Sequence, residues 1–283
     1  MHDLTNVLDA LGLSGALPAI GLGVIALYAA AIILLSLRYP YRPQKILGRR
    51  WFWNDLLCYA IAQSVVVGFL ITLFLLSADE RTGWSRLRLV SDWPFAAQLA
   101  FFLLSHDLFM YFYHRLTHRV RFLWRLHEAG HSVEDVDFVS GLRSHPFEIM
   151  INQSIEFGAM IFLGAAVEVI VVKGLLSLAW GIWLHHNIDL RTGWLQYVIN
   201  GSEMHRWHHH PEHMHQNFAT KFAVWDWIFG TAYLPRDRRC DRYGLDDPSF
   251  RGGWRAQFLA LFRRKTTAPA LRDRSRSGSD RAA

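Results

Sequence analysis

The stretch LLCYAIAQSVVVGFLITLFLLSA, residues 56–78, contains 23 consecutive positions without a charged side chain. A second stretch of 23 such positions, GALPAIGLGVIALYAAAIILLSL, occupies residues 15–37. The hydrocarbon core of a bilayer is about 30 Å thick, and a helix needs roughly 20 apolar residues to cross it. Both stretches therefore predict membrane-spanning helices. Because the 283-residue chain is 52% hydrophobic and only 19% charged, we do not expect a soluble enzyme.

Two further apolar regions complete the predicted membrane part. Residues 93–113 begin with Trp93-Pro94, and proline is typical of the first turn of a helix. Residues 146–186 are too long for one span, and a break at residues 164–168 would divide them into the two arms of a helical hairpin. We therefore predict an all-α, polytopic membrane protein with about four transmembrane helices, the last two forming the hairpin, and a cytoplasmic histidine-rich helical cap. Its predicted parts are a two-span region (1–92), a histidine-containing region (93–235) and a basic C-terminal tail (236–283).

The distribution of charge predicts the orientation in the membrane. No Lys or Arg precedes the first span, whereas five follow it, at Arg38, Arg42, Lys45, Arg49 and Arg50. Basic loops stay in the cytoplasm, so we expect the N-terminus outside and the histidine-rich region and the C-terminus in the cytoplasm. In a bacterium, the membrane of such a multi-pass protein would be the inner one.

The basic tail predicts contact with phospholipids. Residues 236–283 contain 12 Arg and 1 Lys against 6 Asp, a net charge of +7. Beside membrane spans, we expect this charge to meet anionic head groups rather than nucleic acid. Residues 254–262 have the pattern of a helix lying on the membrane surface, and the composition of residues 271–283 is typical of a disordered end.

Histidine spacing predicts a metal centre. Fourteen of the fifteen histidines fall between residues 106 and 215. His114 and His118 are four residues apart, as are His127 and His131, so on a helix both imidazoles of each pair share one face. Further along the chain come His185 and a cluster that begins at His205. Neutral imidazole suits iron, zinc, copper and nickel alike, so the ligand type does not choose the metal.

One short motif within this region offers a competing interpretation. His127-Glu128-Ala129-Gly130-His131 fits H-E-x-x-H, the zinc protease signature in which the glutamate is the general base. The third ligand of the extended signature is absent after Ser132, and a protease does not explain the remaining histidine clusters. A membrane zinc metalloprotease remains an alternative hypothesis.

Seven motifs that follow one another across about residues 95–235 carry a resemblance to a known superfamily. They are Asp107-x-x-x-Tyr111-x-x-His114-Arg115-x-x-His118, Leu123-Trp124-Arg125-x-His127-x-x-x-His131-Ser132, Arg143-x-His145-Pro146-x-Glu148, His185-x-Asn187, His205-Arg206-x-His208-His209, Asn217-Phe218 and Trp225-Asp226-x-x-Phe229-Gly230-Thr231. In these motifs and their order the chain resembles the fatty acid hydroxylase/sterol desaturase superfamily of integral-membrane di-iron oxygenases. It is most similar to the small bacterial-type members, which lack a fused cytochrome domain.

This resemblance implies a lipid hydroxylase or desaturase, with hydroxylation favoured, in which residues 93–235 form the catalytic region. The cofactor would be two iron ions, with O2 as co-substrate, and electrons would come from a separate ferredoxin or cytochrome with its reductase. Asp107 and Asn187 match positions near the site and would orient imidazoles, and His145 is a candidate ninth ligand. The implied iron ligands are His114, His118, His127, His131, His185, His205, His208 and His209.

The chain departs from the superfamily pattern at two positions. Gly130 stands where the second motif usually has a middle histidine, and Gly181 stands where some members have another. A member that has lost its redox chemistry and holds a structural metal is therefore a further alternative. The histidines without a counterpart are expected to be wet interfacial side chains; they are His106, His186, His210, His213 and His215.

Overall fold

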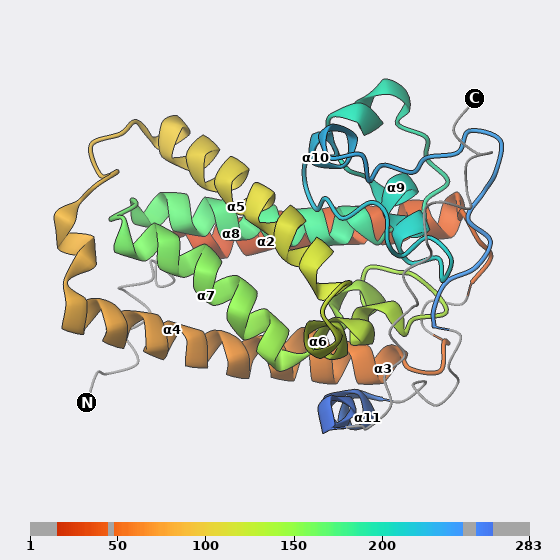
Figure 1. Ribbon diagram of the computed structural model, residues 1–283, viewed down its shortest axis with the longest axis horizontal. Helices are drawn as coiled ribbons and strands as arrows, with labels where there is room; N and C mark the ends of the chain where they lie inside the picture. Colours follow the sequence, from red (N-terminus) through yellow and green to blue (C-terminus); the bar gives the residue numbers. More distant parts are fainter. Residues whose placement is uncertain (1–15, 45–47, 246–252, 263–283) are drawn as a thin grey trace.

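The protein folds into long apolar helices that carry a smaller cap at one end (Figure 1). The structure, a computed structural model, describes residues 16–44, 48–245 and 253–262. Within these residues the regular structure is helical, apart from one antiparallel bridge between Pro40 and Ile188. The predicted all-α fold class is therefore confirmed. The residues expected to form a disordered end, 271–283, lie outside the described part of the chain.

Four helices among the described residues are long and apolar enough to cross a membrane. They are α2 (Ala16–Arg38), the continuous helix Phe52–Thr82, α5 (Phe95–Thr117) and α8 (Val167–Leu184). Large apolar side chains on them face outward, and Leu27 is 74% exposed. Water would disfavour such a surface, whereas lipid tails match it. The predicted number of about four spans is confirmed, but the region 146–186 supplies one of these candidates and not two.

The second span changes its helical winding along its length. It begins with α3 (Phe52–Asn54), continues as the π-helical segment η1 (Asp55–Gln63) and ends as α4 (Ser64–Thr82). Gly83 ends it at a φ of +66°, a left-handed conformation that glycine adopts without strain. The short η2 (Trp84–Leu87) then leads towards Pro94, after which α5 starts.

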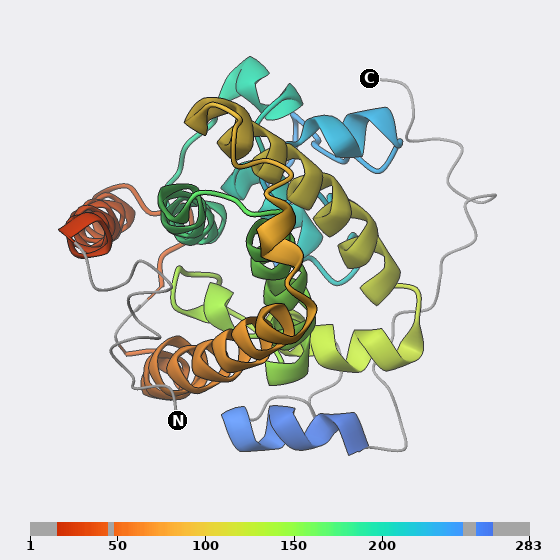
Figure 2. The ribbon, with the colours of Figure 1, turned by 90° about the vertical axis from the view of Figure 1, so that its left-hand side faces the viewer.

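The predicted helical hairpin is present, and its arms diverge. The first arm is α7 (Pro146–Phe162) and the second is α8, so the break falls at residues 163–166, where Gly164 has a φ of +75°. Before this turn, α7 packs against α4, where it contacts Val67, Ile71 and Leu75. In contrast, α8 packs against α2, where Ile182 meets Ile32 (Figures 1 and 2).

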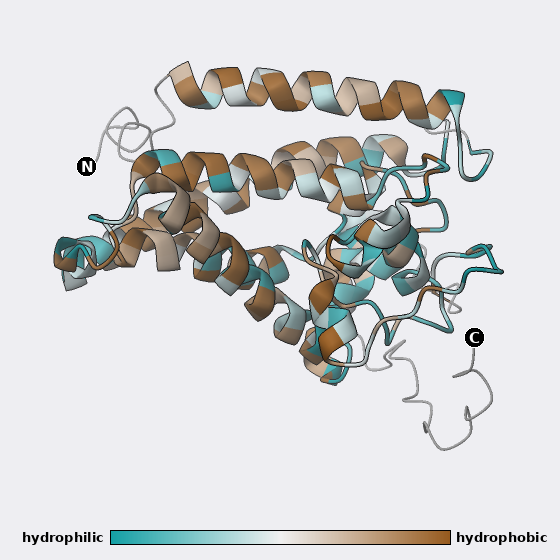
Figure 3. Cartoon of the chain, turned by 90° about the horizontal axis from the view of Figure 1, so that it is seen from above, coloured by the Kyte–Doolittle hydropathy of each residue, from teal (hydrophilic) through white to brown (hydrophobic). Residues whose placement is uncertain are grey.

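The helix ends that lead to histidines all lie at one end of the bundle. Just after α2, the backbone N–H of Tyr41 donates to the carbonyl of Asn187, which follows α8, at 2.8 Å. The short elements gather at this end, and Figure 3 shows it as the more hydrophilic part of the molecule. They are α6 (Arg121–His131), η3 (Ser140–Leu142), η4 (Gly193–Tyr197), α9 (Ser202–His208) and α10 (Val224–Ile228). A histidine-rich helical cap is thus confirmed, whereas its side of the membrane stays a prediction.

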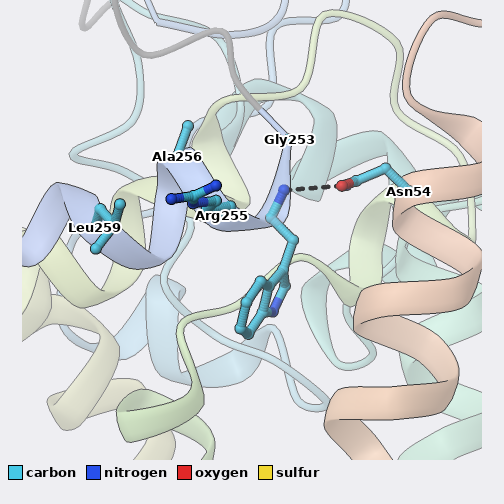
Figure 4. A pocket seen from close by; sticks show the side chains of 6 residues that line it. Asn54, Gly253, Arg255, Ala256 and Leu259 are labelled. Carbon is cyan, nitrogen blue, oxygen red and sulfur yellow. Dashed lines mark hydrogen bonds between the residues drawn. The ribbon is translucent and has the colours of Figure 1, made fainter.

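The C-terminal helical segment packs against the protein at the same end. It consists of α11 (Trp254–Phe258) and η6 (Leu259–Phe262). The backbone N–H of Trp254 donates to Oδ1 of Asn54 at 2.8 Å (Figure 4), and the ring of Phe258 stacks on His145. Trp254 and Phe258, which the membrane-surface pattern would turn towards lipid, therefore face the protein, while Phe262 is 71% exposed. A shallow pocket beside this segment is lined by Asn54, Gly253, Trp254, Arg255, Ala256 and Leu259.

Candidate metal centre

Two adjoining groups of buried imidazoles lie in the cap. In each group every side chain offers one ring nitrogen, and these nitrogens lie within 4.8 Å of one another. The five-histidine group draws on α5, α6 and α9 and consists of His114, His118, His127, His131 and His208. The three-histidine group lies at the ends of α8 and α9 and consists of His185, His205 and His209. The structure thus brings together all eight histidines that the sequence proposed as ligands.

Backbone carbonyls orient two rings of the five-histidine group. Nδ1–H of His114 donates to the carbonyl oxygen of Phe218 at 2.8 Å. Nδ1–H of His208 donates to the carbonyl oxygen of Gln216, also at 2.8 Å. A hydrogen bond of this kind fixes the tautomer, so the Nε2 lone pair of each ring is free to bind a metal.

A carboxylate orients a third ring. Nδ1–H of His127 donates to Oε1 of Glu148 at 2.7 Å, and the other carboxylate oxygen accepts from the hydroxyl of Ser144 at 2.7 Å. Carboxylate partners of this kind raise the basicity of metal-binding histidines. The sequence motif contained Glu148, but its role follows only from the fold.

A backbone carbonyl also orients one ring of the three-histidine group: Nδ1–H of His185 donates to the carbonyl oxygen of Gly181 at 2.9 Å.

The separations between Nε2 atoms fit ligands around a metal. They are 3.0 Å for His114–His127, 3.1 Å for His127–His131, 2.9 Å for His185–His205 and 3.0 Å for His205–His209. With metal–nitrogen bonds of 2.0–2.1 Å, ligands at right angles lie about 2.9 Å apart, whereas tetrahedral ligands lie about 3.3 Å apart. Both spacings lie close to the observed separations, so the paired rings fit ligands of a common metal ion without distinguishing the two geometries.

Burial disfavours the charged form of several imidazoles, and some buried ring nitrogens lack a hydrogen bond. Burial, followed by the charge of neighbouring imidazoles, holds the pKa of His131 and His205 well below the usual value of 6.5. Neutral imidazole is the form that binds metals. Buried nitrogens without a hydrogen-bond partner include both ring nitrogens of His118, Nε2 of His208 and Nδ1 of His209. Such groups are costly to bury, and a bound metal would satisfy the nitrogens that face it. The residues present therefore fit a metal centre.

Close packing fixes the ring of His185. Gly141 of η3 lies against this ring, and a Cβ atom at position 141 would stand 2.2 Å from Cγ of His185. Only glycine fits at this distance. The sequence alone gave no reason to single out this residue.

Two residues expected to orient imidazoles hold loops instead. The carboxylate of Asp107 accepts four hydrogen bonds from residues 220–225, at 2.6–3.0 Å. The side chain of Asn187 exchanges two hydrogen bonds with the backbone of Arg42. Both side chains therefore shape the surroundings of the histidine groups through the chain segments that they anchor.

His145 lies outside both histidine groups. Its Nδ1 accepts from the backbone N–H of Phe147, which caps the start of α7, and its Nε2–H donates to the carbonyl of Phe258 at 3.2 Å. With both ring nitrogens occupied, the side chain is a helix cap in this structure.

Gly130, which stands where the superfamily usually has a histidine, lies beside the carbonyl of Arg143. A Cβ atom at position 130 would meet that carbonyl oxygen at 3.2 Å.

The histidines without a superfamily counterpart divide into two kinds. His210, His213 and His215 are partly exposed, as expected of interfacial side chains. The same expectation is wrong for His106 and His186, which are buried. His186 bonds to its own loop through the backbone N–H of residue 188, and His106 lies within the helical bundle.

A buried network of opposite charges braces the cap. Arg143 donates to Asp55 of η1 at 2.7 Å and to the hydroxyl of Ser132, next to the five-histidine group, at 3.2 Å. Arg49 bridges Asp55 and Asp137, with its Nε 2.6 Å from the latter. The network ties the loop after α2 to the segment between α6 and α7.

Comparisons with known proteins agree with this arrangement. Residues 99–231 match the sequence model of the fatty acid hydroxylase family, which confirms the resemblance carried by the histidine motifs. The chain is 29% identical over 176 residues to an ornithine lipid hydroxylase of Rhizobium tropici, covering 62% of this chain and 53% of that protein. It is 28% identical over 170 residues to human alkylglycerol monooxygenase (58% and 37%) and 31% identical over 140 residues to a sphingolipid C4-hydroxylase of Schizosaccharomyces pombe (48% and 47%).

The chain spans about half the length of the ornithine lipid hydroxylase and less than two fifths of the human alkylglycerol monooxygenase. No solved structure matches it.

Proposed function

We propose that this chain, whose residues 99–231 match the fatty acid hydroxylase family, is a membrane-bound di-iron oxygenase acting on a lipid. The reaction would insert oxygen into an unactivated C–H bond, with desaturation as the related outcome. The observation that carries this proposal is the pair of buried histidine groups with nitrogens that converge. Family membership supports the reaction class.

The five-histidine group would hold one iron ion and the three-histidine group the other. Bound iron supplies the redox chemistry with O2 that side chains cannot perform. The protein orients the imidazoles through Phe218, Gln216 and Glu148 and keeps them buried, away from bulk water. Three imidazoles would leave more coordination positions of a bound ion open than five would, so further ligands would have more room at the three-histidine group.

The substrate would be a lipid that reaches the site from the bilayer. The relatives are named for ornithine lipids, alkylglycerols and sphingolipids, which share long hydrocarbon chains. The histidine groups lie at the end of helices with exposed apolar side chains. A lipid could therefore present a carbon to the site while its remaining chain stays in hydrocarbon.

Electrons would come from a separate ferredoxin or cytochrome with its reductase. Such carriers are commonly acidic, and basic side chains are exposed on the cap, among them Arg119, Arg121 and Arg238. The same arginines could also contact phospholipid head groups.

We propose that the cap faces the cytoplasm, with the N-terminus outside and the tail, residues 236–283, on the cytoplasmic side. The basic loop after α2 lies at the cap end of the bundle, as the positive-inside rule requires. Residues 1–92 would anchor the chain and residues 93–235 would form the catalytic region, in the inner membrane if the source is bacterial.

The zinc protease alternative fits the geometry less well. A catalytic zinc site uses three protein ligands and keeps a fourth position for water. Here His127 and His131 of the H-E-x-x-H motif share one group with three further imidazoles. Five imidazoles in one group favour a larger coordination number than a catalytic zinc site uses.

Metal analysis of the detergent-purified protein, grown with iron-57, tests the proposal. We expect two coupled iron ions per chain by elemental analysis and Mössbauer spectroscopy. A single zinc ion without iron, persisting after iron-rich growth, would contradict the oxygenase and support the protease or a structural metal site.

A further inference from the structure

A second cluster of polar side chains lies within the helical bundle, apart from both histidine groups. We call it the buried ion-pair cluster; it consists of His106 of α5, Asn152 and Glu156 of α7, and Lys173 and Ser177 of α8. Lys173 donates to Oε1 of Glu156, which also accepts from the hydroxyl of Ser177 at 3.0 Å. Nε2–H of His106 donates to Asn152 at 3.1 Å, and its Nδ1 lies 3.4 Å from Nζ of Lys173.

The charges of this cluster are buried inside the helical bundle, where placing a charge costs free energy. Lys173 is 1% exposed and Glu156 6% exposed, and both belong to helices of the predicted membrane hairpin. Ionisable groups at membrane depth are rare and mostly functional. A buried ion pair often adds no stability over an apolar pair of similar volume, although removing one partner is strongly destabilising. Stability alone therefore does not explain this cluster.

The cluster lies at one level of three helices that lead to the metal centre. On α5, His106 precedes His114 by eight residues. On α8, Ser177 precedes His185 by eight residues, and on α7, Glu156 follows Glu148 by eight. At 1.5 Å per residue, each of these three distances along a helix is about 12 Å, whereas Asn152 lies about 6 Å from Glu148 and Lys173 about 18 Å from His185. The cluster thus forms a band centred about 12 Å from two ligands and from the carboxylate that orients His127.

Apolar packing is not the only contact that aligns these three helices. They share an apolar cluster of Phe102, Met160 and Val169, and the two arms of the hairpin also pack on α4 and α2. Lipid tails are as apolar as these side chains, so the hydrophobic effect adds little to such contacts, and interhelical hydrogen bonds gain importance. The hydrogen bonds of the buried ion-pair cluster are directional and join α5, α7 and α8 directly.

We propose that the buried ion-pair cluster is a positioning element for the metal centre. It fixes the relative translation and rotation of α5, α7 and α8, so that His114 and His185 lie in ligand position and Glu148 in position to orient His127. The inference deepens the proposed function, on which it rests only in requiring that the histidine groups bind a metal ion.

The test replaces the ion pair by an apolar pair in the full-length protein. The double variant Lys173→Met/Glu156→Leu removes both charges together, so neither is left uncompensated. Purified, metal-free protein is titrated with Co2+ in competition with a chelator, and its melting temperature is measured in the same detergent. We expect a melting temperature at least equal to that of the parent. The affinity for Co2+ should fall by about 10- to 100-fold, the effect typical of residues that orient metal ligands.

A matched control removes the exposed ion pair Arg88–Asp92, whose atoms lie 3.9 Å apart near the opposite end of the bundle. The variant Arg88→Gln/Asp92→Asn should bind Co2+ as the parent does. Parental affinity in the apolar double variant would overturn the proposal. Failure of that variant to fold would also overturn it, because the pair would then serve stability. A parent that binds Co2+ but never iron would contradict only the oxygenase function.

Discussion

The substitution Gly141→Ala isolates the three-histidine group from the rest of the metal centre. The new methyl group would stand 2.2 Å from Cγ of His185, whereas ordinary van der Waals contact begins at 3.4 Å. The new methyl group and the imidazole of His185 must therefore move apart by about 1.2 Å, the difference between these two distances. Metal–ligand distances tolerate only about 0.2 Å. Unless η3 moves by the whole amount, His185 leaves ligand position and only His205 and His209 remain in its group.

We expect the variant to lose one metal ion and keep the other. Affinity at the three-histidine group should fall at least about 100-fold, since loss of a ligand exceeds the effect of losing an orienting partner. The three atoms nearest to the new methyl group all belong to His185, so the clash falls on the three-histidine group. Elemental analysis after iron-rich growth should therefore give one iron per chain in place of two, and lipid hydroxylation should be abolished.

Gly181→Ala is the matched control. Position 181 lies one helical turn before His185, and a Cβ atom there meets nothing within 4 Å. Its carbonyl still accepts from His185, and alanine favours the helix by about 1 kcal/mol. This variant should keep both iron ions. If Gly141→Ala also retained two ions at parental affinity, the reasoning that the methyl group displaces His185 from a ligand position would be refuted.

Three further variants or conditions test the site. Glu148→Gln should lower metal affinity by about 10- to 100-fold in chelator competition, because a neutral amide polarises His127 less; the exposed Glu168→Gln should not. In the metal-free protein, the lowered pKa of buried histidines such as His131 means that unfolding takes up protons below about pH 6.5. Stability present above that pH should be lost as the pH falls, by up to about 1.4 kcal/mol per pH unit for each such histidine, and a flat melting temperature between pH 8 and 5 would contradict this. Glu128→Gln should leave lipid oxidation within about twofold, whereas removing a protease general base costs about 10²–10⁴-fold in peptide hydrolysis.

Local patterns in the sequence predicted the spans and the grouping of the histidines. Uncharged runs report a membrane helix directly, and a spacing of four residues places His127 and His131 on one face of α6 whatever the tertiary fold. The turn of the hairpin was predicted within a few residues, because Gly164 permits a conformation that other residues avoid. All eight proposed ligands come together in the structure, and their role as ligands stays a prediction.

Partners distant in the sequence could not be predicted in this way. Glu148 is 21 residues from His127, and their contact depends on how α7 begins beside α6. Asp107 resembles an orienting residue by position, yet its oxygens bind the loop 220–225, more than 100 residues away. Similarly, a pattern of residue types does not reveal that both nitrogens of His145 are occupied by backbone groups.

His208 and His209 are adjacent in the chain but belong to different histidine groups. Consecutive Cα atoms across a trans peptide bond are separated by about 3.8 Å, a distance that thermal motion barely changes. A single peptide bond therefore links the five-histidine group to the three-histidine group. Movement of the surrounding helices therefore cannot separate the two groups by more than rotation of the His208 and His209 side chains allows.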